Sequence, residues 1–205
     1  MTDKSLQNKS KSSTDIDFSQ RDPAEGVDAL FYQRWSPRSF NKKPIDEKSL
    51  KTIFDAARWA PSCYNDQPWR FITSNGNQDF DIFCNLLTEF NQKWASNASL
   101  LGFIVARKHF EHNGKPNQLA AFDCGAAWLA MTLQARLLGL YTHGMGGIKR
   151  EEIYKAFDLD PAEYEVICGF ALGYIDSANH MPDDLAEIEK PSARKPLEQI
   201  WQRGA

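Results

Sequence analysis

The chain has 205 residues, of which 42% are hydrophobic, and its formal net charge at pH 7 is −3. This length suits one compact domain, or one subunit of an oligomer, and the charge leaves no basic surplus for binding nucleic acid. No apolar run is long enough to span a bilayer, and the N-terminus lacks the apolar core of a secretory signal. We therefore expect a cytoplasmic protein that binds small molecules and has neither nucleic acid nor a membrane as a partner.

The N-terminal segment is rich in Ser, Lys, Asn, Gln and Asp, so we expect residues 1–21 to form a flexible polar tail. A single domain should then occupy residues 22–205. Its first helix is expected to begin at Asp22, because Pro23 fits the first helical position and Glu25 completes a capping box. The segment "RWSPRSF" should end that helix, because proline cannot continue a helix and disfavours the helical conformation of the residue before it.

Periodicity and turn residues divide the middle of the chain into helices and strands. The expected elements, in chain order, are a helix in 44–61, a strand in 70–76, a helix in 83–94, a strand in 99–106, a long helix in 119–140, a glycine-rich loop in 141–150, a short helix in 150–157 and a strand in 164–174. The long helix is apolar almost all round and rich in small residues, which predicts a central position in the fold. Because the elements lack the regular βαβ cadence of a doubly wound fold, we expect an α+β fold with helices around one mixed or antiparallel sheet.

The segment "RWSPR" places two basic side chains and a hydroxyl at alternate positions. If the segment is extended, Arg34, Ser36 and Arg38 point to one side while Trp35 faces away. Two guanidinium groups and a hydroxyl suit a phosphate monoester, because an arginine fork offers paired charge-assisted hydrogen bonds to its oxygens. The alternative is a solvated basic turn, since charged runs are usually surface features.

The segment "PSCYNDQPW" combines amides, small polar groups and a cysteine. Asn65 and Gln67 supply donors and acceptors that match the edge of a heterocycle with carbonyl and imino groups. The alternative is a helix-terminal turn whose polar groups cap the backbone. Cys63 could instead be a nucleophile, but none of the four histidines lies in a recognisable cysteine-hydrolase context. The four cysteines are far apart in sequence and are interpreted as reduced core residues.

The segment "HGMGG" follows neither the Rossmann nor the Walker glycine spacing. Its glycines would still let the backbone approach a planar ligand closely. His143 beside them is interpreted as a satisfied loop histidine rather than a catalyst. The sequence has no HExxH, no paired Cys/His spacing and no GxSxG, so we expect no metal site and no serine hydrolase.

Taken in order, several segments resemble the nitroreductase family of FMN-dependent NAD(P)H oxidoreductases. "RWSPRSF" is similar to the family's "RRSxRxF", and "AARWAPSCYNDQPWRFI" is similar to its "AxxAPSxxNxQPWxF". "NQKWASNASLLGFIVA", "GMGG", "ALGY" and "ARKPLEQIW" resemble later family segments, so the likeness runs from about Ala24 to Trp201. The resemblance implies a nitroreductase-like α+β homodimer with an extended C-terminal arm and two FMN molecules in the subunit interface, each touched by both chains.

The same resemblance implies which residues hold the cofactor. The "RWSPR" residues would hold the phosphate, ribityl chain and pyrimidine edge, with an arginine of the arm reaching the phosphate. The "PSCYNDQPW" residues would lie on the ring side, the asparagine-containing helix would face the flavin's polar edge, and the glycine pair would bring backbone near N5. The implied cofactor-binding residues are Arg34, Trp35, Ser36, Arg38, Ser62, Cys63, Asn65, Gln67, Asn91, Lys93, Gly146, Gly147 and Arg194. The chain departs from the family pattern at Trp35, where a basic residue is common, at Cys63-Tyr64, and in the arm, which offers Ser192-Ala193-Arg194 instead of Lys-x-Arg.

The activity that the resemblance implies is the reduction of small electrophiles. NAD(P)H would give a hydride to N5 of the flavin and leave before a nitroaromatic, quinone or related substrate takes the electrons, which is a ping-pong mechanism. No side chain is required as an acid or base, because this chemistry belongs to the cofactor. Two alternatives stay open: a flavin-binding protein that stores, senses or degrades the cofactor, and a cysteine-dependent transferase.

Overall fold

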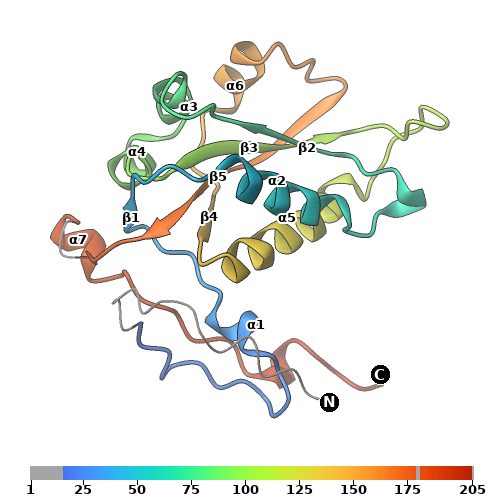
Figure 1. Ribbon diagram of the computed structural model, residues 1–205. Helices are drawn as coiled ribbons and strands as arrows, with labels where there is room; N and C mark the ends of the chain where they lie inside the picture. The colour runs from blue at the N-terminus through green and yellow to red at the C-terminus, as the bar shows by residue number, and fades with distance from the viewer. Residues whose placement is uncertain (1–15, 179–180, 205) are drawn as a thin grey trace.

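The computed structural model describes residues 16–178 and 181–204, and its architecture is the expected α+β arrangement (Figure 1). Five strands form one sheet, and its four strand pairs are all antiparallel. The strands are β1 (Phe40–Asn41), β2 (Trp69–Thr73), β3 (Leu100–Arg107), β4 (Tyr141–Met145) and β5 (Tyr164–Ile175). Their order is β1-β5-β3-β2, and β4 pairs with the part of β5 directly before the residues that pair with β1.

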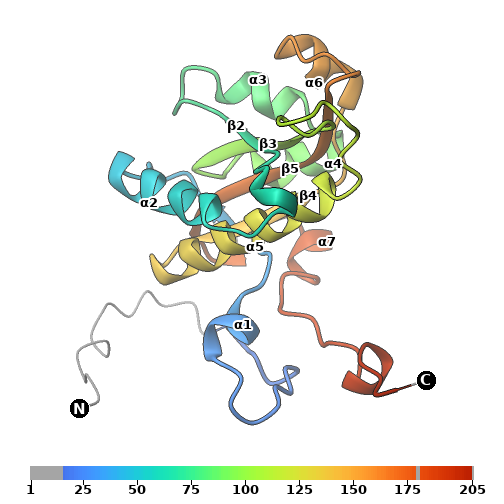
Figure 2. The same ribbon diagram turned by 90° about the vertical axis from the view of Figure 1, so that its right-hand side faces the viewer.

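Helices cover both faces of this sheet (Figure 2). They are α1 (Ala29–Gln33), α2 (Glu47–Arg58), α3 (Phe80–Asn85), α4 (Glu89–Ala95), α5 (Ala120–Leu137), α6 (Arg150–Ala156) and α7 (Asp183–Ala186), with short 3-10 helices η1 (Cys63–Asn65) and η3 (Leu197–Gln199). α2 and α5 pack on one face, while α3, α4 and α6 lie over the other.

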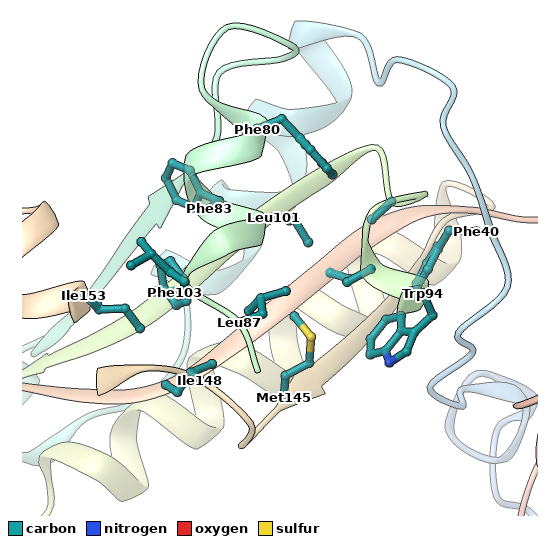
Figure 3. Packing of buried hydrophobic residues seen from close by; sticks show 14 of the residues in the cluster. Phe40, Phe80, Phe83, Leu87, Trp94, Leu101, Phe103, Met145, Ile148 and Ile153 are labelled. Carbon is teal, nitrogen blue, oxygen red and sulfur yellow. The ribbon is translucent and has the colours of Figure 1, made fainter. Parts of the chain in front are cut away.

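The central strand β3 shows why both faces need helices. Leu101, Phe103 and Val105 join one hydrophobic cluster, while Ile104 between them joins the other. All four are almost fully buried, which agrees with a continuous apolar run in a strand covered on both sides. On the α3 side, Phe83 stacks on Phe103 with 5.6 Å between ring centroids (Figure 3).

Helix α2 packs on α5 through the face that its sequence predicts. Asp46 caps α2 by accepting a hydrogen bond from the backbone N–H of Ser49 (2.9 Å). Ile53 and Ala57 are completely buried in the cluster that α2 shares with α5. The helix ends before Pro61, as expected.

The first helix begins later than the sequence predicts. Gly26 adopts a φ of +86°, in the left-handed region, so the helix expected from Pro23 cannot continue through it. Asp28 is the actual cap, since its side chain accepts a hydrogen bond from the backbone N–H of Leu30 (2.8 Å). The capping box expected at Asp22 is therefore wrong.

The helix expected in 83–94 is divided into α3 and α4. Between them Leu87 forms an isolated antiparallel bridge with Ile148. The backbone N–H of Thr88 donates to the carbonyl of Gly147 (3.0 Å). Pairing with a distant segment therefore overrides the local helical spacing.

The glycine-rich loop expected in 141–150 contains strand β4. Its residues pair with β5 in a regular antiparallel register from Tyr141 opposite Gly173 to Met145 opposite Gly169. Glycine has a low intrinsic preference for strands, so the sequence gives a weak signal here. The strand conformation of these residues is therefore stabilised by their hydrogen bonds to β5.

The two ends of the described chain extend on the same side of the body, below the sheet in Figure 1. Helix α1 lies there, beside the segment that follows α7. Ile16 and Phe18 are partly buried and pack against the cluster on the α3 face. Of the tail predicted for residues 1–21, residues 1–15 lie outside the described part, and the last six residues carry these contacts.

Candidate functional site

One pocket gathers basic side chains from separate parts of the chain. It has a volume of about 340 Å³. The backbone after α1 is extended, with Arg34 at φ −72° and ψ 123°, so Arg34 and Ser36 share a side, and their Nη1 and Oγ atoms lie 3.3 Å apart. The pocket is lined by Arg21, Arg34, Trp35, Ser36, Arg38, His143, Ile188, Lys190, Ser192 and Arg194. The alternate spacing of "RWSPR" therefore brings its polar side chains together.

Trp35 also lines the basic pocket but is chiefly a core residue. It is buried in the α3-side cluster, and its ring meets Tyr141 edge-on at a centroid distance of 6.5 Å. The guanidinium of Arg136 lies over the ring of Tyr141, with its Cζ 4.2 Å from the ring centroid. The residue that departs from the family pattern is thus used for packing.

The basic pocket has no carboxylate among its lining residues. Within residues 16–178 and 181–204, no ion pair involves Arg34, Arg38 or Arg194. Burial, together with the charges of Arg194 and Arg21, lowers the pKa of Arg34. The Nε of Arg38 is buried without a hydrogen-bond partner in the described structure. Among the described residues, Arg34 donates only to Ser36 and Arg194 only to its neighbours Ser192 and Ala193, so these like charges have no acidic partner among the lining residues. Such an arrangement fits a phosphate group, which supplies both acceptors and negative charge.

A buried carboxylate fixes the backbone beside these arginines. Glu189, in the segment after α7, accepts hydrogen bonds from the backbone N–H groups of Arg38 (2.8 and 3.0 Å) and Ser39 (2.8 Å). Burial raises the pKa of Glu189, and the hydrogen bonds from these two N–H groups, together with the charge of Arg38, oppose that rise. The C-terminal segment and "RWSPR" are therefore joined at the edge of the pocket.

Strand β4 contributes His143 to the same pocket. The His143 ring lies 4.6 Å from that of Trp94, and its Nδ1 is 2.9 Å from the carbonyl oxygen of Pro37. A carbonyl only accepts, so Nδ1 carries the proton. Burial, reinforced by Arg38 and Arg34, lowers the pKa of His143 to about 4. At neutral pH the ring is uncharged and satisfied, as the sequence predicts, although it lies on a strand.

The "PSCYNDQPW" loop has an unusual backbone. Tyr64, Asn65 and Gln67 all adopt positive φ angles of 52°, 54° and 49°. Residues other than glycine rarely adopt this conformation, which costs roughly 1–3 kcal/mol for each residue. Such strain persists only where surrounding contacts hold it.

Contacts from the loop and from α5 hold this backbone. Asp123, only 2% exposed, accepts a hydrogen bond from the backbone N–H of Cys63 (3.1 Å). The Oγ of Ser62 accepts from the backbone N–H of Gln67 (3.0 Å), whose side-chain amide donates to the carbonyl of Asn65 (3.0 Å). Burial raises the pKa of Asp123. Ser62 and Cys63 thus form the base of the loop, while Asn65 and Gln67 form its tip.

A second pocket of about 420 Å³ opens beside the loop tip. Three aromatic rings, those of Tyr64, Phe110 and His112, lie 5.4 to 5.7 Å from one another. The ion pair between Asp66 and Arg107 (3.2 Å) links the loop to the end of β3. The pocket is lined by Tyr64, Asn65, Asp66, Gln67, Arg70, Glu111 and His112.

Helix α4 and the glycine pair meet at a third place. The side-chain amide of Asn91 is buried and donates to the carbonyl of Gly147 (2.9 Å). A Cβ on Gly147 would lie 2.7 Å from Asn91 Nδ2 and from Thr88 Oγ1, whereas a Cβ on Gly146 would meet nothing within 4 Å. Lys93 is exposed on α4 and lines a small cavity. Arg38 lines both this cavity and the basic pocket.

The predicted site residues therefore fall into groups within one chain. "RWSPR" and Arg194 share the basic pocket, Asn65 and Gln67 line the pocket beside the loop, and neither pocket contains residues of the other group. The sequence interpretation assigned no site role to several lining residues, namely Arg21, Tyr64, His112, Lys190 and Ser192. No motif marks them, because their proximity to the pockets depends on the fold.

The protein has an α+β fold with one antiparallel sheet, and its basic pocket is lined by five cationic side chains, those of Arg21, Arg34, Arg38, Lys190 and Arg194. The model of the family described as "Nitroreductase family" matches residues 32–82 and 72–174. The chain belongs to the nitroreductase family.

Individual relatives agree with this assignment. A crystal structure of an oxidoreductase containing FMN is 45% identical, with a TM-score of 0.86, and the match covers 90% of this chain and 95% of that one. A 4-nitrobenzoate reductase of Pseudomonas putida is 27% identical over 213 residues, covering 80% of this chain and 93% of the relative. A 5,6-dimethylbenzimidazole synthase of Rhodospirillum rubrum is 48% identical over 48 residues, which are 23% of each protein. The relatives support an FMN oxidoreductase in general terms.

The described residues contain neither a membrane-spanning helix nor a metal cluster. No helix in the described part of the chain has the length and apolar character that a bilayer span requires. Over the same residues, no group of three or more His, Cys, Asp or Glu side chains is placed to hold a metal ion. All four cysteines are free thiols.

Proposed function

We propose that the protein takes electrons from NAD(P)H through FMN and passes them to nitroaromatic, quinone or related small electrophilic substrates by a ping-pong mechanism. The observation that carries this proposal is the basic pocket, where arginines converge and no carboxylate is among the lining residues. A phosphate-bearing cofactor meets that requirement. The FMN-containing relative supports the choice of FMN.

In this proposal the two pockets bind opposite ends of the cofactor. Arg34, Arg38 and Arg194 donate to the phosphate, with Ser36 beside the ribityl chain. The amides at the tip of the "PSCYNDQPW" loop, together with Asn91, lie along the flavin ring, and the backbone at the glycine pair approaches it. FMN when bound supplies hydride acceptance and donation at N5, while the protein provides binding, orientation and exclusion of water.

A homodimer would bring the two groups of residues together. They occupy separate pockets of one chain, and the helix α5 leaves large apolar side chains in solvent, including Phe122 at 75% exposure. The C-terminal segment likewise exposes Ile200 and Trp201. Apolar surface of this kind is typical of an interface. We propose that the loop of one subunit completes the basic pocket of the other.

The cytoplasmic location stays a prediction.

The test begins with the absorption spectrum of the purified protein before and after NADH or NADPH under anaerobic conditions. We expect flavin bands that bleach with the reductant and return when menadione or a nitroaromatic is added. Steady-state rates should give parallel double-reciprocal lines, as a ping-pong mechanism requires. A colourless protein that takes up no added FMN would overturn the proposal.

A second candidate is a flavin-binding protein that stores, senses or degrades the cofactor. One observation favours it: the relative that is 48% identical over 48 residues is named a synthase, not a reductase. Such a protein would bind flavin but would not turn over NAD(P)H with added acceptors. Irreversible loss of the flavin bands after NADH and oxygen would identify a degrading activity.

A cysteine-dependent transferase gains no support. In the described structure, no hydrogen bond joins the thiol of Cys63 to a base; the hydrogen bonds of this residue are those of its backbone, whose N–H donates to Asp123 and whose carbonyl accepts from the N–H of Asp66. A thiol needs a base or a lowered pKa to act as a nucleophile. Retention of activity after Cys63→Ser would agree with this conclusion.

A further inference from the structure

We propose that Arg21 is a further phosphate ligand, contributed by the N-terminal segment that precedes the family-matched residues. The inference rests on the proposed FMN site and extends it. The segment ahead of α1 would then form one wall of the phosphate end of the site, and recognition of FMN over riboflavin would depend on it.

Arg21 lies in the basic pocket although it is distant from the "RWSPR" motif in sequence. It lines the same pocket as Arg34, Arg38 and Arg194. The family match begins at Tyr32, and the Nη1 of Arg21 donates to the carbonyl oxygen of that same residue (3.2 Å). This hydrogen bond directs the guanidinium toward the start of the motif.

The backbone around Arg21 is held in place from the other side. Its N–H donates to the carbonyl of Phe18 (2.9 Å). Phe18 and Ile16 pack against the hydrophobic cluster on the α3 face. An arginine on an unanchored tail would be free to turn into solvent. Arg21 is instead fixed between the core and the carbonyl of Tyr32.

Most of the hydrogen-bonding capacity of Arg21 is unused. A guanidinium offers five N–H donors, and the described structure gives Arg21 one side-chain hydrogen bond and no ion pair. Its Nε is buried without a partner. Buried donors normally have acceptors, so this arrangement suits an anion in the pocket.

The charges around Arg21 favour the same ligand. Burial and the neighbouring charge of Arg194 lower the pKa of Arg21, and Arg21 in turn acts on Arg34. Lys190 adds a further cation, and no acid is among the lining residues. Glu189, at the edge of the pocket, is a nearby carboxylate, and its charge interacts with Arg38. A phosphate monoester carries close to two negative charges at neutral pH and several acceptor oxygens. It would relieve the repulsion and satisfy the free donors.

The first experiment uses Arg21→Gln, with Lys155→Gln as the matched loss of one positive charge. Lys155 lies exposed on α6, at the opposite end of the molecule from α1 (Figure 1). Apoprotein of each variant is titrated with FMN and with riboflavin, and binding is followed by flavin fluorescence. Arg21→Gln should weaken FMN binding about tenfold, as expected for one charge-assisted hydrogen bond, and leave riboflavin binding unchanged. Lys155→Gln should change neither.

The second experiment needs no flavin. Inorganic phosphate is added to apoprotein, and the rise in melting temperature is measured. We expect a clear rise for the wild type and for Lys155→Gln, a much smaller rise for Arg21→Gln, and an intermediate one for Arg21→Lys, which keeps the charge without the fork. The melting temperatures without phosphate show whether each variant is folded.

The outcomes separate this inference from the proposed function. If Arg34→Ala loses FMN affinity while Arg21→Gln binds FMN and responds to phosphate like the wild type, Arg21 is not a phosphate ligand and the FMN proposal stands. If the wild type binds no flavin but Arg21→Gln loses the response to phosphate, the FMN proposal fails while Arg21 remains an anion ligand. Equal losses for FMN and riboflavin in Arg21→Gln would contradict a phosphate contact.

Discussion

The carboxylate of Asp123 lies 3.1 Å from the backbone nitrogen of Cys63 and joins helix α5 to the strained loop. Asp123 is nearly inaccessible to solvent, so the contact is protected from competition by water. It stabilises the turn that precedes three left-handed residues.

We expect Asp123→Ala to lower the free energy of unfolding by about 1–3 kcal/mol, because it removes the acceptor of the partly buried N–H of Cys63. Asp123→Asn keeps an acceptor oxygen at the same place and should cost less. Urea denaturation of the three proteins measures the difference. Equal stability of Asp123→Ala and the wild type would show that the contact does not hold the loop.

Substitution by alanine should affect stability differently at Gly146 and at Gly147. A Cβ at Gly147 would lie 2.7 Å from both Asn91 Nδ2 and Thr88 Oγ1, whereas Gly146 has open space. Gly147→Ala should therefore destabilise the apoprotein by about 1–3 kcal/mol through overpacking, and Gly146→Ala should not. Thermal melts without flavin test this pair. If Gly146→Ala keeps its stability but binds FMN more weakly, it supports the proposed approach of backbone to the ring.

The buried His143 should make stability depend on pH. Its pKa is about 4 in the folded protein and about 6.5 in an unfolded chain. Between these values the unfolded state binds more protons, so the free energy of unfolding falls as the pH is lowered from about 6.5 to about 4. The loss of unfolding free energy that is due to His143 reaches about 3 kcal/mol at pH about 4.

His143→Asn, which keeps a donor for the carbonyl of Pro37, should lose this part of the pH dependence. The raised pKa values of Asp123 and Glu189 act in the opposite direction, but they are common to both proteins and cancel in the comparison. Denaturation at several pH values measures the difference. Superimposable pH profiles would mean that His143 does not titrate as described.

Riboflavin and FMN should distinguish the arginines from the amides. Arg34→Ala and Arg194→Ala should weaken FMN by roughly 1.5–3 kcal/mol, or about ten- to a hundredfold, and affect riboflavin little, because riboflavin has no phosphate. Asn65→Ala and Gln67→Ala should weaken both ligands equally. Fluorescence titrations of the four variants provide the comparison. Parallel losses for both ligands in the arginine variants would refute the phosphate assignment.

The proposed dimer should depend on the exposed face of α5. Light scattering at micromolar concentration should give the mass of two chains for the wild type. Phe122→Glu, which places a charge on this face, should shift the mass toward one chain. Ile82→Glu on α3 is the matched control, because Ile82 is also exposed, at 55%. A wild-type mass of one chain with flavin bound would rule out the dimer.

The local sequence was sufficient where the determining interactions are themselves local. The continuous apolar run of β3 predicted its burial on both faces, and the spacing of Ile53 and Ala57 predicted the buried face of α2. The alternate positions of Arg34 and Ser36 likewise predicted a shared side, because side-chain direction in an extended segment follows from the backbone.

Only the tertiary structure decided the features that depend on distant partners. Strand β4 exists because β5 pairs with it, and α3 ends where Leu87 meets Ile148. Arg21 reaches the basic pocket because Phe18 and Tyr32 anchor it there. No periodicity or motif encodes such contacts, since their free energy comes from segments far apart in the chain that meet only on folding.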